Sequence, residues 1–127
     1  MSFPGSARAM GFVNVRDRTT AKLFYGDVLG FALVAEDDFA AVYDMGGLIV
    51  RVSTVESYMV GAHPVLGWGV TDISEAARAL RGRGVTFLIY PGFGQDELGI
   101  WSAPDDSARV SCFNDPEGNM LSLTQFG

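Results

Sequence analysis

The sequence repeats one order of elements twice, and this repeat constrains the fold more than any other feature. In each half, a strand-like run ends at an aspartate, apolar residues at helical spacing follow, and short apolar runs of strand length complete the half. Asp17 and Asp72 stand at the two strand-to-helix junctions, where an aspartate side chain can cap a helix. The letters of the two halves differ, so the pattern carries the repeat rather than sequence identity.

The repeat predicts a helix from Asp17 to Gly30 in the first half and one from Asp72 to near Gly82 in the second. The predicted strands are residues 9–15, 31–35, 39–43 and 48–53, and then 65–70, 85–90, 99–103, 108–113 and 120–124. Neither half has enough core to fold alone. We therefore expect one α+β domain over residues 1–127, made of two βαβββ modules, residues 9–54 and 65–125. They would form one curved, cupped mixed sheet with the helices on its outer face.

The net charge and the cysteine content of the chain indicate which classes of binding partner and which compartment suit it. The chain has 15 Asp and Glu against 9 Lys and Arg, a net charge of −6, which disfavours nucleic acid and anionic membrane and suits a neutral or cationic small molecule. The single cysteine, Cys112, cannot form an internal disulfide. Residues 1–17 lack the apolar stretch of a signal peptide, and no apolar run reaches membrane-spanning length. These features predict a cytoplasmic protein.

Two motifs resemble the signatures of the vicinal-oxygen-chelate superfamily. Residues 24–31, Phe-Tyr-Gly-Asp-Val-Leu-Gly-Phe, are similar to its F-Y-x-x-x-L-G-F motif at the end of the first helix. Residues 113–123, Phe-Asn-Asp-Pro-Glu-Gly-Asn-Met-Leu-Ser-Leu, are similar to its closing F-x-D-P-x-G-N-x-L-x-L motif. The superfamily includes glyoxalase I, extradiol dioxygenases, fosfomycin-modifying enzymes and bleomycin-resistance proteins. The resemblance covers residues 9 to 125 and implies the doubled βαβββ fold.

Enzymes of this superfamily usually hold one divalent metal through inward-facing His, Gln or Glu side chains on the first and last strands of each module. The resemblance places these four positions at Met10, Arg51, Val65 and Ser122. None of them offers the carboxylate or imidazole donor that such an ion needs. The one histidine, His63, lies two positions before Val65 and would share its face if the strand extended that far, but it stands beside a proline, which is typical of a linker. We therefore expect no metal and no other cofactor, as in a metal-free branch of the superfamily.

The four positions that the resemblance assigns to metal ligands identify the strand face that would line the cup. Because side chains alternate along a strand, the other residues of this face follow from them. Gly67 and Gly69 are predicted to leave open floor in it. The expected ligand-binding residues are Met10, Phe12, Asn14, Arg51, Val65, Gly67, Phe93, Trp101 and Ser122.

Three of these residues have alternative interpretations. An inward-facing Arg51 needs a partner, either an acidic neighbour such as Asp44 or a polar group of a ligand. Phe93 and Trp101 lie in a long segment at the rim of the cup, where they could stack on a planar ligand. They could equally cover a sheet edge or a dimer interface.

Two functions from different classes follow. The first is a binding protein resembling bleomycin-resistance proteins, which sequesters or carries a small aromatic or cationic compound. The second is a glyoxalase-like lyase or a dioxygenase-type enzyme. No acid–base pair lies among the inward residues, so no catalytic residue is predicted, and Cys112 is expected to be a buried structural thiol. A cup merely filled by side chains would instead indicate an interaction module.

We also expect a homodimer, because the rim aromatics offer apolar area to bury.

Overall fold

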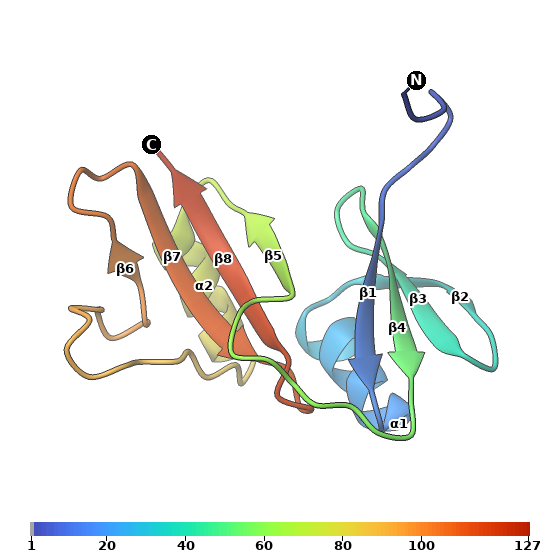
Figure 1. Cartoon of the computed structure of the whole chain (residues 1–127). Coiled ribbons are helices and arrows are strands. Elements are labelled where there is room, and N and C mark those ends of the chain that lie inside the picture. Colours follow the sequence, from blue (N-terminus) through green and yellow to red (C-terminus); the bar gives the residue numbers. More distant parts are fainter. Residues whose placement is uncertain (1) are drawn as a thin grey trace.

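The computed structural model describes residues 2–127 and consists of two modules, each a four-stranded mixed sheet with helical segments against one face (Figure 1). Module 1 contains β1 (Met10–Val15), α1 (Arg18–Lys22), the π-helix η1 (Leu23–Val28), β2 (Ala32–Glu36), β3 (Ala40–Asp44) and β4 (Ile49–Thr54). Module 2 contains β5 (Leu66–Gly69), α2 (Ile73–Gly82), β6 (Trp101–Ser102), β7 (Ala108–Asn114) and β8 (Met120–Phe126). The predicted α+β class and the βαβββ order of both halves are confirmed.

The strands form two sheets rather than the single hydrogen-bonded sheet that the repeat suggested. Their orders are β1-β4-β3-β2 and β5-β8-β7-β6. In each, the first strand of the module runs parallel to the last, and the other pairs are antiparallel. β1 and β5 are edge strands at the facing sides of the two sheets (Figure 1). Instead, side chains on the helix-covered faces of the two sheets pack together and join the modules. The two modules therefore share a core although β1 does not pair with β5.

Both helical segments begin where the aspartates predict. The Asp17 carboxylate accepts from the Thr20 amide at 3.1 Å, and the Asp72 carboxylate accepts from the Glu75 amide at 3.1 Å. Each bond satisfies one free N–H of a first turn. The second half of the first helix is a π-helix, for which the residue spacing gave no signal. Within residues 2–127, no helix is long and apolar enough to cross a lipid bilayer.

The predicted strand at residues 85–90 is not a strand. This segment contacts β7 through one bridge, between Phe87 and Phe113, and through the Leu88 amide, which donates to the Cys112 carbonyl at 2.8 Å. β6 pairs with a different stretch of β7, where Trp101 lies opposite Val110. Two short segments therefore share the outer edge of β7. The chain between them, residues 89–100, forms a loop because its backbone groups are hydrogen-bonded to its own polar side chains, as described below.

The strands alternate as predicted between a helix-facing side and an opposite side. The helix-facing residues are almost completely buried: Val13, Val15, Val50, Val52, Leu121 and Leu123. On the opposite face, which the sequence assigned to the cup, Met10 and Phe12 are 47% and 63% exposed. The predicted cup face is thus open to solvent in a single chain.

An aromatic cluster joins the two modules. The ring of Phe113 on β7 lies 6.4 Å from that of Phe24 on η1, 6.4 Å from that of Trp68 on β5, and 5.5 Å from that of Phe87. Trp68 also stacks on Phe31 of module 1 at 5.4 Å. Aromatic pairs at these separations add to the stabilisation that apolar burial already provides.

A buried polar network connects the two sequence motifs. Asp115 accepts hydrogen bonds from the Tyr25 hydroxyl at 2.7 Å, from the Asn119 side-chain amide at 2.9 Å, and from the backbone amides of Glu117 and Asn119. The Asn119 side chain also donates to the Asn14 carbonyl of β1 at 2.9 Å. Burial, and then the charge of Asp115, raises the pKa of Tyr25 far above its ordinary value, so the phenol remains a donor. The F-Y and D-P-x-G-N motifs therefore meet in space and hold the modules together.

Candidate functional site

A pocket of about 400 Å³ opens on the predicted cup face of module 2. It lies beside the outer edge of β7, between the part that contacts Leu88 and the part that pairs with β6. Cys112 lies opposite Ser122 in the β7–β8 ladder and therefore shares its sheet face. The pocket is lined by Tyr90, Phe93, Gln95, Gly99, Trp101, Val110, Ser111 and Cys112.

The loop over this pocket is held by Gln95 and Asp96. The Gln95 side-chain amide donates to the carbonyls of Leu88 at 2.9 Å and Gly99 at 2.8 Å, and its oxygen accepts from the Tyr90 amide at 2.7 Å. The Asp96 carboxylate accepts from two further loop amides at 2.9 Å each. Both donor hydrogens and the oxygen of the Gln95 side-chain amide are engaged in these bonds. Gln95 therefore shapes the pocket wall rather than binding a ligand.

Gly99 allows the loop to close against the rest of the module. Its φ of +73° lies in the left-handed region, and a Cβ at this position would stand 2.8 Å from the Leu88 carbonyl oxygen. A residue with a side chain at this position would therefore force the loop away from Leu88. Leu98 and Ile100, on either side, are buried and anchor the loop in the core.

The pocket is apolar and carries no charged side chain among its lining residues. Tyr90 and Phe93 pack edge to face with their ring centroids 6.0 Å apart. Phe93 is 63% exposed and Trp101 is 39% exposed, so both rings are available to a ligand. This combination favours a flat, uncharged molecule and disfavours an anion, which would find no cation to pair with.

Cys112 contributes a thiol to the pocket, which the sequence interpretation did not anticipate. It is a free cysteine of intermediate exposure, not the buried structural thiol expected. Burial raises the pKa of the thiol, so it remains protonated at neutral pH and is a poor nucleophile. The signal that could have found it was its even spacing from Val110 and its register with Ser122, which places all three on one face.

The nine predicted ligand residues do not form one cavity. Phe93 and Trp101 line the module 2 pocket. Val65, Gly67 and Ser122 belong to the same module but lie outside its lining, whereas the remaining four, Met10, Phe12, Asn14 and Arg51, belong to module 1. The prediction placed all nine residues in one site because it assumed that the two modules form one continuous cup. In the structure they lie on two separate modules.

Gly67 does not provide the open floor that was expected. A Cβ at this position would collide with the Ser122 hydroxyl oxygen, so the Ser122 side chain already fills the space. At Gly69, by contrast, no atom lies within 4 Å of where a Cβ would stand. Only the second of the two glycines therefore leaves room on this face.

Arg51 has an acidic partner, but it is Asp37 and not Asp44. The Arg51 guanidinium donates to the Asp37 carboxylate at 3.0 Å, whereas Asp44 accepts from the Gly47 amide at 3.0 Å. The Phe39 amide, the Arg51 guanidinium and the Ala40 amide together hold the pKa of Asp37 below its usual value. The ion pair is partly exposed, and it supports a structural role for Arg51.

Substituting Arg51→Met is expected to raise the pKa of Asp37 only part of the way to its usual value, because the backbone amides still donate to the carboxylate. A lowered carboxyl pKa stabilises the fold above the unfolded-state pKa, and this contribution disappears as the pH falls through the folded-state pKa. The variant should therefore be slightly less stable at neutral pH and converge with the parent in acid. NMR titration of the Asp37 carboxyl measures this, with Arg8→Met as control. An unchanged Asp37 pKa would contradict the ion pair.

The four positions that the family resemblance assigns to a metal do not fit one. Arg51 is a cation already engaged by Asp37, Val65 has no donor atom, and Met10 and Ser122 offer a thioether and a hydroxyl. His63 is exposed in the segment between the modules. Across residues 2–127, no group of three His, Cys, Asp or Glu side chains is arranged to hold a metal ion.

Comparison with known proteins gives one family and many structural neighbours. The family model described as Glyoxalase/Bleomycin resistance protein/Dioxygenase superfamily matches residues 7–123. A glyoxalase family protein from Enterococcus faecalis has a TM-score of 0.73 at 16% identity, covering 94% of this chain and 98% of its own. A fosfomycin resistance protein from Listeria monocytogenes has a TM-score of 0.75 at 11% identity, covering 96% and 94%. An integron cassette protein from V. cholerae has a TM-score of 0.65 at 18% identity, covering 98% and 100%. No curated protein shows significant sequence similarity. At these identities the neighbours establish the fold alone.

Proposed function

Because the chain belongs to the glyoxalase/bleomycin resistance protein/dioxygenase superfamily, we propose that it is a small-molecule binding protein that sequesters or carries a flat, uncharged aromatic compound without a metal. The ligand would occupy the module 2 pocket. The observation that carries this proposal is the lining itself, three aromatic side chains and no charged one. A pocket of this size and polarity is typical of small-molecule sites.

The enzyme alternative has less support. A lyase or dioxygenase of this superfamily would need a metal or a general acid–base pair in the pocket. The only ionisable side chains in the lining are the Tyr90 phenol and the Cys112 thiol, and the thiol has a raised pKa. The thiol is therefore a poor base near neutral pH.

We further propose that a second copy of the chain covers the exposed cup faces. The helix-distal face of module 1 presents Met10 and Phe12 to solvent, and that of module 2 presents Val65, Trp101 and Phe126. Apolar side chains gathered on corresponding faces of both modules are typical of protein interfaces. Such a homodimer would also enclose the module 2 pocket more fully.

Binding is tested by titrating neutral and anionic probes of similar shape. We expect 2-naphthol and indole to raise the melting temperature, and 2-naphthoate not to raise it at the same concentration. Trp101→Ala should weaken binding of 2-naphthol by about tenfold or more, since burying an aromatic face is worth roughly 1.5–3 kcal/mol. Calorimetric titration of both the parent and the variant with 2-naphthol measures this loss.

The matched control is Phe39→Ala, which removes an exposed aromatic ring from module 1 and should bind 2-naphthol like the parent. Equal binding of 2-naphthol by Trp101→Ala would overturn the assignment of the pocket. Elemental analysis of protein purified without chelator completes the test, because a stoichiometric divalent metal would contradict the metal-free proposal.

A further inference from the structure

A second cavity, of about 390 Å³, lies where the two modules meet, on the helix-covered side of the module 2 sheet. Leu29 and Phe31, in the turn between η1 and β2, line it from module 1. From module 2 it is lined by one face of α2, by the end of β5 and by residues of β7 and β8. This junction cavity is separate from the aromatic pocket of module 2, because the two share no lining residue.

The junction cavity is apolar except for one charged side chain, Arg83. Phe113 and Leu123 are almost completely buried and form its inner end, whereas Arg83 is exposed and stands at its opening. A ligand that enters this cavity must therefore be apolar along its length, and only its outer end can carry a polar group.

The lining favours an alkyl chain over a flat ring. Trp68 stacks on Phe31 with ring centroids 5.4 Å apart and on Phe113 with centroids 6.4 Å apart, at interplanar angles of 18° and 13°. Because these rings already stack on one another, a planar ligand gains little by stacking on them. The remaining side chains of the lining, other than Arg83, are aliphatic.

The Arg83 guanidinium is held across the junction and still has free donors. Its Nη2 donates to the Asp27 carbonyl of module 1 at 3.1 Å. Gly30 leaves the approach to Nη1 open, because even a Cβ there would stand 3.9 Å from this atom. Within residues 2–127 the guanidinium forms no ion pair. An arginine held in this way can donate two parallel N–H···O bonds to a carboxylate.

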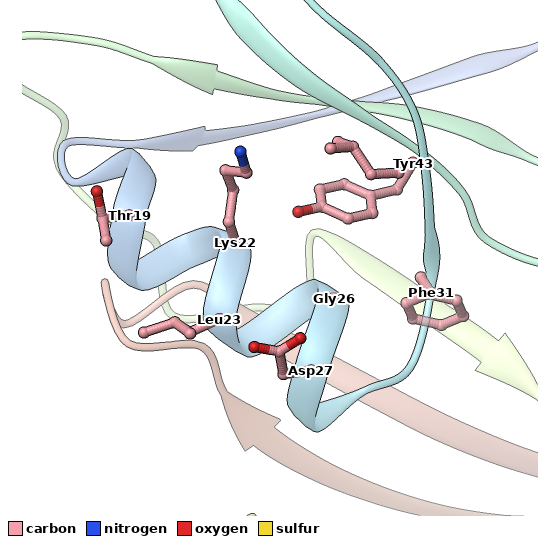
Figure 2. Close-up of a pocket in the computed structure, with 8 residues that line it drawn as sticks. Thr19, Lys22, Leu23, Gly26, Asp27, Phe31 and Tyr43 are labelled. Atoms are coloured by element: carbon pink, nitrogen blue, oxygen red, sulfur yellow. The ribbon is translucent and has the colours of Figure 1, made fainter.

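The charge around Arg83 is positive on balance. Arg78 and Arg81, at the same end of α2, are exposed and form no ion pair with any residue that the structure describes. The nearby acid, Asp27, forms no ion pair with Arg83, and its side chain lines a different groove, between the α1–η1 segment and β3 (Figure 2). Glu75, the acid within α2, stands roughly 12 Å along the helix axis from Arg83. An anionic group is therefore favoured at the opening.

We propose that the junction cavity binds a medium-chain aliphatic carboxylate. The carboxylate accepts hydrogen bonds from the free donors of Arg83, and the alkyl chain extends inward past Ala79 and Leu80 toward Phe113. All four residues line the cavity. Removal of the alkyl chain from water supplies most of the affinity. Because the bound chain contacts both modules, it also stabilises their junction.

The test is an amide NMR titration with probes that separate the chain from the charge. We expect octanoate to give saturable shifts at the amides of Phe31, Gly69, Ala79 and Arg83. Hexanoate should bind roughly tenfold more weakly, because it buries two fewer methylene groups, and acetate should not bind at the same concentration. Octanol has the same chain without the charge and should bind more weakly than octanoate. Octylamine should bind most weakly of the three eight-carbon probes, because Arg83 repels its ammonium group.

Three variants assign the contacts. Arg83→Met deletes the charge, keeps an apolar stem and should weaken octanoate binding about tenfold or more, the usual worth of hydrogen bonds to a charged group. Arg81→Met is the matched control: it deletes the same charge from the same end of α2, outside the lining, and should have little effect. Ala79→Leu, which a helix tolerates, fills part of the cavity and should weaken octanoate and octanol alike.

Several outcomes would overturn this assignment. They are the absence of saturable shifts with octanoate, equal binding of octanoate and octanol, and equal losses in Arg83→Met and Arg81→Met. Shifts confined to the module 2 pocket would also overturn it, as would shifts that follow protein concentration rather than octanoate, which would place a second copy of the chain over the cavity. None of these results depends on the 2-naphthol experiment, because that ligand is assigned to the other pocket.

Discussion

Replacing Asp115 by alanine is expected to lower the free energy of unfolding by about 3–5 kcal/mol, a large fraction of the stability of a small protein. The Asp115 carboxylate accepts four hydrogen bonds, from the side chains of Tyr25 and Asn119 and from two backbone amides. The substitution leaves a completely buried Tyr25 hydroxyl without a partner. An unpaired buried donor costs the full desolvation energy of that group. Urea unfolding followed by circular dichroism measures the loss.

Two further variants identify the cause of that loss. Tyr25→Phe removes one of the four bonds and should cost less than Asp115→Ala. Asp105→Ala removes an exposed aspartate whose carboxylate accepts from the nearby Ser107 amide, and it should change stability little. If Asp115→Ala were no more destabilising than Asp105→Ala, the network between the motifs would not hold the modules together.

The sequence predicted the elements that depend on neighbouring residues. Asp17 and Asp72 cap helices because the capping interaction spans only a few residues. Val13 and Val15 face the helix and Phe12 faces away, because side chains alternate along any strand. The two motifs identified the family. Their physical role, the contact between Tyr25 and Asp115 across 90 residues, was not visible in the spacing of either motif.

The candidate site was predicted only in part, because it depends on contacts distant in sequence. Phe93 and Trp101 were expected at a rim and do line the module 2 pocket. Its shape, however, depends on Gln95, whose three hydrogen bonds fold the loop over β7. A glutamine in a loop carries no local signal for that role. The separation of the two cup faces into two sheets was likewise not visible in the sequence, since strand alternation identifies a face but not which sheets join.

Substituting Phe12→Glu is expected to abolish the proposed homodimer while leaving the fold intact. Phe12 is 63% exposed on the face away from the helices, so the single chain loses little packing when it is replaced. In a two-fold interface the change occurs twice, and each copy forfeits roughly 1.5–3 kcal/mol of apolar burial in addition to the cost of an unpaired buried charge. The dissociation constant should therefore rise by a factor on the order of a thousand or more. Sedimentation velocity at micromolar concentration measures this. Phe3→Glu, at a 90% exposed position outside the sheets, is the control and should remain dimeric. A parent protein that sediments only as a 13.6 kDa species, or a Phe12→Glu variant that sediments as the parent dimer does, would refute this interface.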